Sequence, residues 1–378
     1  MKKLKIAYIT SANRGLAHYV VSLDQSLRKY FKTYYITYAD ALIDDLIKEK
    51  FKNIYKLIKS NNPQGIIDTL NFLKKNNIKY ININIGTTAR KNYLLFSILL
   101  AQAKLSGIKI IGTLHDVMPF ESFYIEPAAI GLLYLNIDYY LVGSESEKDK
   151  LQTYFDVPSE KIYIVKHGPY LIFDNKKYTK FSAREKLNIA QDKKTILFFG
   201  SLKPHKGLKY LVKAFGKIKN DFPKALLYIS TDLTYSPQLK EYVSRIKKSG
   251  AAEHIKLITK FCKSSEIEPI FKASDIVVLP YTNVSQSGIL QLAYGFKKPV
   301  IVTNIFSDAS LIHNKFGVVV KNSDVDSLAN GISKLLRMDN KKLIKLGEDS
   351  YSYAIKYNSW DKIAETIYQI SKNDEQKK

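Results

Sequence analysis

The sequence contains a single cysteine, Cys262, and only six histidines. One cysteine excludes an internal disulfide and suits a reducing compartment. The histidines are dispersed, and no cluster of His, Cys, Asp and Glu has the spacing of metal ligands, so the sequence indicates no metal site. Gly-x-Ser-x-Gly and Walker-type lysine motifs are also missing, which disfavours an α/β-hydrolase and a P-loop NTPase.

Long hydrophobic runs are missing as well. The best apolar stretches, 94–103 and 128–137, fall far short of the roughly 20 residues that span a bilayer. Residues 1–5 lead directly into a strand pattern without a small-residue cleavage site, so no signal peptide is expected. The sequence therefore predicts a cytoplasmic protein without a transmembrane helix.

Acidic residues are scarce beside basic ones: 35 Asp and Glu against 59 Lys and Arg give a net charge of +24. Such an excess favours contact with anions, whether phosphorylated substrates, acidic membrane surfaces or nucleic acid. An alternative explanation is an AT-rich genome, which favours lysine codons. The lysines are dispersed and form no long basic tail, which fits this alternative. Nucleic-acid binding has only this charge and 27 tyrosines in its favour, since no recognition motif is present.

The 378 residues are enough for two α/β domains. Strands are expected at 5–10, 34–37, 80–85, 109–114, 139–142 and 162–165, and, after a polar linker at 174–180, at 195–199, 225–230, 255–258, 276–280 and 300–303. Helical patterns separate them, which predicts parallel sheets covered on both faces. We expect two doubly wound Rossmann-like domains facing a central cleft, 1–175 and 176–356, with a C-terminal helix in 357–378 crossing back to the first domain and ending in a frayed tail.

One of the expected helices, residues 45–60, combines apolar positions with five lysines. A basic amphipathic helix can lie on anionic lipid. The pattern favours the alternative, a helix that packs its apolar stripe on its own sheet.

The most informative segment runs from Thr195 to Gly207. A buried strand ends at Gly200, where the chain turns, and the loop carries Lys206 before a helical pattern begins at Gly207. Parallel α/β sheets bind phosphates at such strand-to-helix loops. The interpretation of Lys206 as an ordinary surface lysine remains open, because glycine turns and lysines are common in this chain.

A second phosphate cradle is predicted at Ser285-Gln286-Ser287-Gly288, between an apolar strand and a helix of small and apolar residues. The backbone N–H groups at a helix N-terminus attract anions, and the serine hydroxyls can add hydrogen bonds. An ordinary N-cap made by Ser285 or Ser287 accounts for the same pattern.

The first half ends several strands with polar loops. The first loop offers Arg14 and Gly15 without a full Gly-x-Gly-x-x-Gly fingerprint, which disfavours a dinucleotide enzyme, and His18 follows on the next helix. His115 and Asp116 end the strand at 109–114, where a histidine can bind a sugar hydroxyl. His167 closes the last strand of this half. A loop histidine without a role is the alternative at His115.

Taken together, these motifs resemble the retaining GT-B glycosyltransferases of family 4, the glycosyl transferases group 1. The resemblance lies in Phe198-Phe199-Gly200 to Lys206-Gly207-Leu208, Phe271 to Pro280, Ser285 to Gly288, Lys298-Pro299-Val300-Ile301, Trp360 to Ala364, Arg14 to Tyr19, Thr113 to Val117 and Lys166-His167-Gly168. It covers nearly the whole chain.

The resemblance implies a retaining, metal-independent hexosyltransferase that moves a hexose from a UDP- or GDP-sugar to a glycan or lipid-linked acceptor, without a cofactor, in the cytoplasm or at the inner face of the membrane. It assigns catalytic roles to His115, Lys206 and Asp116, donor binding to Arg14, Gly15, Gly200, Ser201, Lys203, Phe261, Ser285, Gln286, Ser287 and Gly288, and acceptor-side roles to His18 and His167.

Two positions depart from the family pattern. Ser201 stands where the family has an arginine on the donor diphosphate, and Lys203 is our candidate for the missing charge. The family's Glu-x7-Glu pair is missing, because residues 284–293 contain no acidic residue; Ser285 or Gln286 would bind there through neutral hydrogen bonds, which are weaker than charge-assisted ones. The alternative function is therefore a catalytically weakened GT-B protein that binds a sugar nucleotide or serves as a partner subunit.

Overall fold

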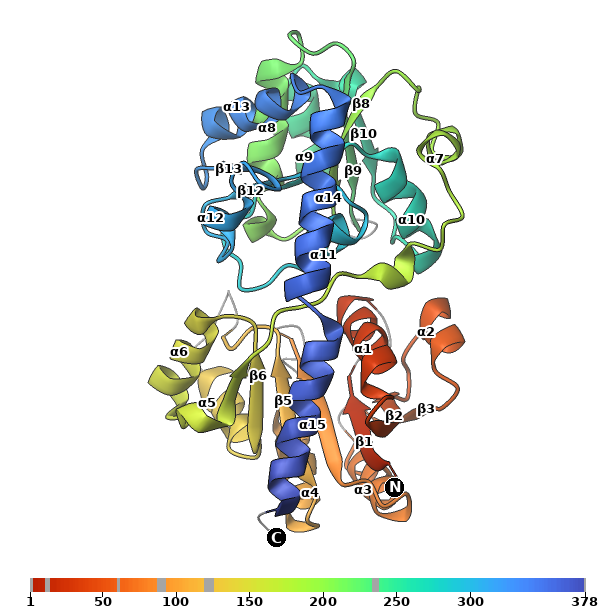
Figure 1. Ribbon diagram of the computed structural model, residues 1–378, viewed down its shortest axis with the longest axis vertical. Coiled ribbons are helices and arrows are strands. Elements are labelled where there is room, and N and C mark those ends of the chain that lie inside the picture. Colours follow the sequence, from red (N-terminus) through yellow and green to blue (C-terminus); the bar gives the residue numbers. More distant parts are fainter. Residues whose placement is uncertain are drawn as a thin grey trace. The chain divides into compact units, whose positions relative to one another are not determined.

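The computed structural model describes residues 3–10, 14–59, 62–86, 93–118, 126–232 and 238–376. The chain forms two compact units: unit 1 comprises Met1–Gly168 with Asn358–Lys378, and unit 2 comprises Pro169–Tyr357. The first break precedes residue 175, because a short 3-10 turn at Leu171–Phe173 packs on helix α10 (Ser264–Ala273) of unit 2 (Figure 1).

Unit 1 is built on a parallel sheet of seven strands in the order β3-β2-β1-β4-β5-β6-β7. The strands are β1 Leu4–Ile9, β2 Phe31–Tyr38, β3 Ile54–Ile58, β4 Tyr80–Ile85, β5 Lys109–Leu114, β6 Tyr139–Val142 and β7 Ile162–Ile164. The intervening helices are α1 Arg14–Leu27, α2 Asp45–Lys50, α3 Gln64–Lys75, α4 Tyr93–Leu105, α5 Glu126–Tyr134 and α6 Glu145–Phe155. Every residue of β4 is buried, as expected for a central strand covered on both faces.

The last helix of the chain, α15 (Trp360–Gln376), belongs to unit 1 and packs on α1 (Figure 1). Tyr30 and Tyr368 stack with ring centroids 4.6 Å apart. The hydroxyl of Tyr80 donates to the carbonyl of Ser371 at 3.0 Å, and its burial, together with the nearby carboxylates, raises its pKa above the usual range. Residues nearly 300 positions apart in the chain therefore complete one core.

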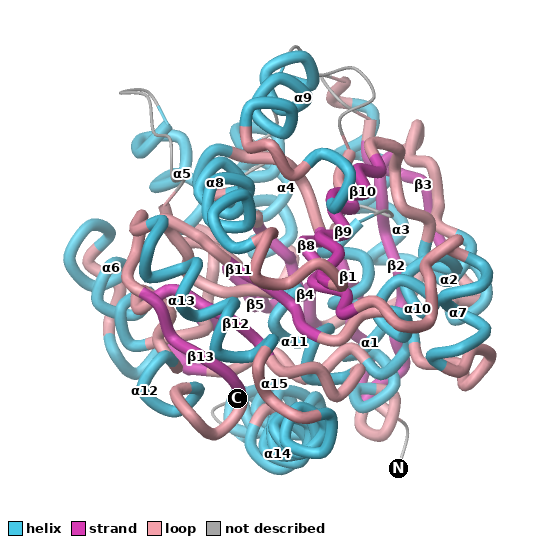
Figure 2. Tube along the Cα trace, turned by 90° about the horizontal axis from the view of Figure 1, so that it is seen from above, coloured by secondary structure: helices cyan, strands magenta, loops and turns pink. Residues whose placement is uncertain are grey.

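Unit 2 contains a parallel sheet of six strands in the order β10-β9-β8-β11-β12-β13. They are β8 Lys194–Phe199, β9 Ala225–Ser230, β10 Ile255–Ile258, β11 Ile276–Leu279, β12 Val300–Thr303 and β13 Gly317–Val320, and the further helices are α7 Lys180–Lys186, α8 Leu208–Ile218, α9 Gln238–Lys248, α11 Gly288–Gly295, α12 Ala309–Ile312, α13 Val325–Leu336 and α14 Asn340–Tyr357. Figure 2 shows helices on both sides of the strands, with α8 packed against α9 and α13, and α11 against α14.

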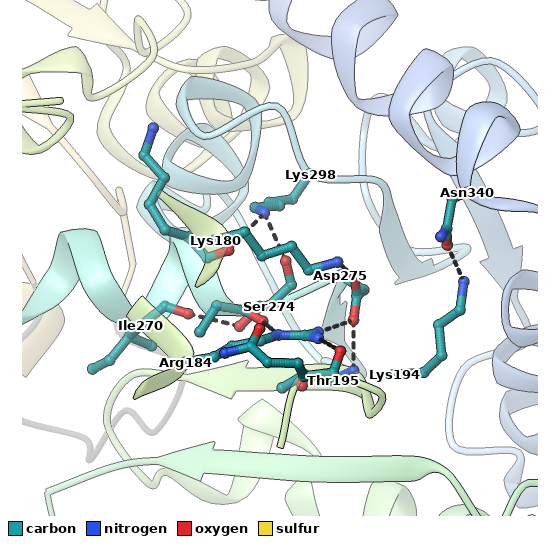
Figure 3. A network of polar contacts seen from close by, with 12 residues as sticks. Lys180, Arg184, Lys194, Thr195, Ile270, Ser274, Asp275, Lys298 and Asn340 are labelled. Atoms are coloured by element: carbon teal, nitrogen blue, oxygen red, sulfur yellow. Dashed lines mark hydrogen bonds and ion pairs between the residues drawn. The ribbon is translucent and has the colours of Figure 1, made fainter. Parts of the chain in front are cut away.

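A buried ion-pair network ties α7 to the sheet of unit 2 (Figure 3). Asp275 accepts hydrogen bonds from Arg184 Nη2 at 2.8 Å and from the backbone N–H of Thr195 at 2.7 Å, and it also pairs with Lys180. Lys298 donates to the carbonyl of Ser274 at 2.6 Å, and burial lowers the pKa of its ammonium to about 8. The network holds the segment after the linker against the start of β8.

The two parallel sheets with interleaved helices confirm the predicted α/β class. One local prediction is wrong: residues 45–60 do not form a single basic helix, because α2 ends at Lys50 and 54–58 form the edge strand β3. Three further elements were not expected, namely α7 within the polar segment after the linker, the one-turn helix α12 and the short strand β13. The proposed lipid-binding helix at 45–60 therefore does not exist.

Candidate functional site

The strand order of each sheet reverses at one place, between β1 and β4 in unit 1 and between β8 and β11 in unit 2. Chain segments leaving the two strands at such a point diverge, which opens a crevice at the carboxyl edge where doubly wound proteins bind ligands. In unit 2 the loops at this point are 200–207 after β8 and 280–287 after β11. These are the two segments that the sequence singles out as phosphate cradles.

The two loops of unit 2 touch each other at two places. The backbone N–H of Thr282 donates to the carbonyl of His205 at 2.8 Å. Gly207 has a φ of +70°, and a Cβ there would lie 1.8 Å from the carbonyl oxygen of Pro280. Only glycine allows this approach. Gly200, with a φ of +120°, turns the chain off β8 beside Ile289, whose nearest atoms would be 3.7 Å from a Cβ.

Lys206 lies over the face of Tyr281, with its Nζ 3.8 Å from the ring centroid. The ring is buried, while the lysine is half-buried. A cation held on an aromatic face is attracted by the ring quadrupole. The sequence predicts the lysine but gives no sign of the ring beneath it, which comes from 75 residues further along the chain.

The N-terminus of α11 begins at Gly288, and Ser287 is its N-cap. The Ser287 hydroxyl accepts a hydrogen bond from the N–H of Leu290 at 3.2 Å, so the N-cap interpretation of this serine is the one the geometry supports. The first N–H groups of the helix remain an anion-attracting end. A Cβ on Gly288 would be 3.4 Å from the ring of Tyr170.

Four buried polar side-chain atoms in or near these loops have no hydrogen-bond partner among the described residues. They are Ser230 Oγ and Thr231 Oγ1 at the end of β9, next to the turn at Gly200, the hydroxyl of Tyr281, and Gln291 Oε1 in α11. Leaving such a group unsatisfied costs about 1–3 kcal/mol. Unsatisfied groups gathered at a switch point indicate a ligand site, and Gln291 is a candidate that the sequence analysis did not identify.

The remaining predicted donor residues lie at or near the same edge. Ser201 is exposed, and Lys203 is half-buried with its carbonyl accepting the N–H of Lys206. Ser285 and Gln286 are half-buried in the loop before α11. Phe261 follows the edge strand β10 and is 43% exposed.

Unit 1 gathers four rings at the carboxyl ends of β5 and β7. Tyr19 of α1 lies at the centre, with ring centroids 4.7 Å from His115, 4.8 Å from His167 and 5.0 Å from Trp360. The two histidine rings are 5.2 Å apart. Burial lowers the pKa of His115 to about 4, and burial together with His115 lowers the pKa of His167 well below its ordinary value. Both imidazoles are neutral at pH 7.

The tautomer of His115 follows from a chain of side-chain amides on β4. Asn82 Nδ2 donates to Thr113 Oγ1 at 2.9 Å, and Asn84 Nδ2 donates to Asn82 Oδ1 at 2.9 Å. Asn84 therefore presents its oxygen to His115 Nε2, 3.4 Å away. This order places the proton on Nε2 and the lone pair on Nδ1. A neutral imidazole can form hydrogen bonds with hydroxyl groups.

The other predicted residues of unit 1 are less closely grouped. Asp116 is half-buried directly after His115. His18 lies on α1 with its Nε2 4.0 Å from a carboxylate oxygen of Asp44, the N-cap of α2, a contact between two helices of the unit. Gly15 is exposed at the start of α1. Arg14 opens the same helix, and its side chain lies outside the described part of the chain, as do residues 11–13.

The described residues contain no group of three or more His, Cys, Asp and Glu side chains placed to hold a metal ion. No helix among them is both long and apolar enough to cross a membrane. A cavity of about 780 Å³ lies beside α14, lined by Lys315, Phe316 and Lys341 among others, and it contains none of the predicted site residues.

The sequence of unit 2 matches a known family. Residues 179–353 match the model of glycosyl transferases group 1. Over 234 residues the chain is 25% identical to an uncharacterized glycosyltransferase of Methanocaldococcus jannaschii, covering 61% of this chain and 58% of that protein. It is 26% identical over 250 residues to the D-inositol 3-phosphate glycosyltransferase of Corynebacterium glutamicum, covering 62% and 56%. The chain thus spans less than two thirds of these relatives.

Solved structures resemble the chain over its whole length. HepE of Anabaena, in complex with UDP and glucose, has a TM-score of 0.78 at 16% identity, covering 98% of this chain and all of that one. Sucrose-phosphate synthase of Thermosynechococcus elongatus has a TM-score of 0.76 at 16% identity, with both chains fully covered. At such identities the likeness establishes the fold, which is that of the GT-B glycosyltransferases.

Proposed function

We propose that this chain is a glycosyltransferase that transfers a hexose from a nucleotide-diphosphate sugar to a glycan or lipid-linked acceptor. The observation that carries the proposal is Lys206, held on the face of Tyr281 at the switch point of unit 2. The group 1 family match and the whole-chain likeness to a UDP-bound glycosyltransferase structure support it.

Unit 2 would hold the donor. Breaking the bond between the sugar and the diphosphate leaves negative charge on the departing phosphate, and preorganised positive groups stabilise that charge. Lys206 supplies a full charge and the N-terminus of α11 a partial one. Gly200 and Gly207 let the backbone approach the phosphates closely, and Gln291 and the hydroxyls of Ser230 and Thr231 are available to nucleoside hydroxyls.

Unit 1 would contribute through His115. With its pKa near 4, the ring is neutral and does not exchange protons near neutral pH, so it would contact a sugar hydroxyl as a neutral group. We assign it to orienting a sugar rather than to acid–base catalysis. Asp116 stays a proposed contributor beside it, and His167 and His18 stay proposed acceptor-side residues.

The finer features of the activity are part of the same proposal. Retention of the anomeric configuration and metal independence follow from the resemblance to family 4. Neutralisation of the diphosphate by Lys206 and by the N-terminus of α11 is compatible with both. A UDP-sugar is the first donor to test, because HepE was solved with UDP and glucose. Glycan or glycoconjugate synthesis in the cytoplasm, at the inner membrane face, is the setting we propose.

Calorimetry with UDP tests the donor site. Lys206→Met should weaken UDP binding by tenfold or more, because a hydrogen bond to a charged group contributes about 1.5–3 kcal/mol. Lys209→Met is the matched control: it removes the same charge from the exposed start of α8, beside Tyr210. Equal affinity losses in both variants would show general charge attraction and would remove Lys206 from the site.

A second measurement separates the enzyme from the catalytically weakened alternative. Wild-type protein incubated with UDP-glucose and other nucleotide sugars should release UDP faster than a blank, with and without EDTA, and NMR of the released sugar should show the donor's anomeric configuration. Tight UDP binding without any donor turnover or transfer would favour the alternative of a catalytically weakened binding protein. That alternative is motivated by the missing Glu-x7-Glu pair.

A further inference from the structure

Two neighbouring helices of unit 1, α4 and α5, expose aliphatic side chains to solvent. On α4 these are Leu94, Ile98 and Leu105, which are 63%, 45% and 82% exposed. Leu132, in the last turn of α5, and Leu135, directly after α5, are 48% and 75% exposed. The two helices pack against each other. We call these five residues the aliphatic surface.

The aliphatic surface follows the helical repeat. Residues 94, 98 and 105 fall on one face of α4, whereas Phe96, Leu99, Leu100 and Ala103, on the opposite face, are buried against the sheet. The helix is therefore apolar on both sides, and Lys104 is its one charged residue. A helix that is apolar all round is normally buried or in contact with lipid. Helix α14 differs, because it exposes several lysines.

Basic residues occur on the elements next to α4, at the amino-terminal edge of the sheet. Lys74 and Lys75 end α3, which packs on α4, and Lys79 precedes β4; all three are exposed. Lys104 lies in the last turn of α4 and is 43% exposed beside Asp138. Aliphatic side chains with a border of lysines are the composition of surfaces that lie in the interface of an anionic bilayer.

We propose that α4 and α5 dock this protein on an anionic lipid bilayer, with the aliphatic surface entering the acyl boundary and the bordering lysines contacting headgroup phosphates. Protein interfaces concentrate their binding energy in Trp, Tyr and Arg, and leucine is under-represented there, whereas this surface is purely aliphatic. A second copy of a chain with a net charge of +24 would be repelled, while an anionic membrane attracts it.

This surface also replaces the segment that the sequence suggested for lipid contact. Residues 45–60 form α2 and the edge strand β3, so their apolar and basic positions do not share a helix face. The docking surface is independent of the proposed glycosyl transfer. Vesicle binding is measured without any nucleotide, so either proposal can fail while the other stands.

Co-sedimentation with vesicles of known composition tests the proposal. Wild-type protein should bind vesicles of phosphatidylcholine with phosphatidylglycerol and should bind phosphatidylcholine vesicles at least tenfold more weakly. The double variant Ile98→Gln/Leu132→Gln should lose about tenfold or more in binding to the anionic vesicles. The control Ile344→Gln/Ile355→Gln removes two exposed isoleucines from α14 of unit 2 and should bind as the wild type does.

Charge is tested separately, in the same vesicles. Lys74→Gln/Lys75→Gln should weaken binding several-fold, more than Lys341→Gln/Lys342→Gln on α14, and the far-UV spectrum and melting temperature of each variant verify its folding. Equal losses in surface and control variants would overturn the proposal. So would light scattering that shows a wild-type dimer and a monomeric Ile98→Gln/Leu132→Gln variant, because the surface would then bind a second copy.

Discussion

Replacing Gly207 by alanine tests how tightly the two loops of the donor site are joined. The residue has a φ of +70°, and a Cβ would lie 1.8 Å from the carbonyl oxygen of Pro280, whereas real Cβ atoms essentially never approach other atoms below 3.0 Å. A left-handed conformation costs a non-glycine residue about 1–2 kcal/mol. Forcing the carbonyl aside adds about 1–3 kcal/mol of overpacking. We expect a total destabilisation of about 2–5 kcal/mol.

Gly250→Ala is the control for backbone strain alone. It lies in the same unit with a φ of +66°, is exposed, and has only the flexible end of Lys219 near the new Cβ. We expect it to cost about 1–2 kcal/mol. Urea unfolding followed by circular dichroism gives both free energies of unfolding by linear extrapolation to zero denaturant.

The same variant should also affect ligand binding. Moving Pro280 displaces Tyr281, the ring on which Lys206 lies, so UDP affinity should fall in Gly207→Ala and stay unchanged in Gly250→Ala. If the two variants unfold with the same free energy, the close contact between residue 207 and Pro280 is refuted. If Gly207→Ala is destabilised but binds UDP normally, the proposed role of the Tyr281 platform is refuted.

Two further predictions concern buried ionisable groups. Asp275→Ala leaves the guanidinium of Arg184, only 3% exposed, without its carboxylate, so the free energy of unfolding of unit 2 should fall by about 3–5 kcal/mol. The control Asp326→Ala breaks a largely exposed pair with Lys217 and should lower it by less than about 1 kcal/mol. Similar losses in urea unfolding would contradict the buried network. His115 has its pKa lowered from 6.5 to about 4, so the unfolded chain takes up its proton first and stability should fall as pH drops from 6.5 toward 4; His115→Gln should show a shallower fall, and an unchanged slope would refute the burial of this ring.

The sequence predicts most of the fold because its strands are short apolar runs separated by helical periodicity. It fails where the local pattern is ambiguous. Residues 45–60 carry apolar positions compatible with a helix, yet 54–58 pair with β2 as an edge strand, since tertiary pairing overrides a weak local preference. Helix α7 lies in a polar stretch whose fixed position depends on Arg184 and the distant Asp275.

The site is predictable only in part, for the same reason. Loops that follow buried strands can be found from the chain alone, so Lys206 and His115 are identified by position. Their surroundings depend on side chains far along the sequence: Tyr281 under Lys206, and Asn84 on the strand beside that of His115. Gln291 carries no local signal, because only the folded structure shows that its amide oxygen is buried without a partner among the described residues.

The return of α15 to unit 1 has a consequence for the biosynthesis of the protein. Unit 2 is a continuous stretch, 169–357, inserted into a unit whose last piece is 358–378. A ribosome therefore synthesises all of unit 2 before it makes Trp360, whose ring packs against Tyr19 and would meet a Cβ on Gly168. Until α15 is made, unit 1 is incomplete, and the face of α1 on which α15 packs is uncovered. During that time the apolar face of α1 is the surface that a chaperone would protect.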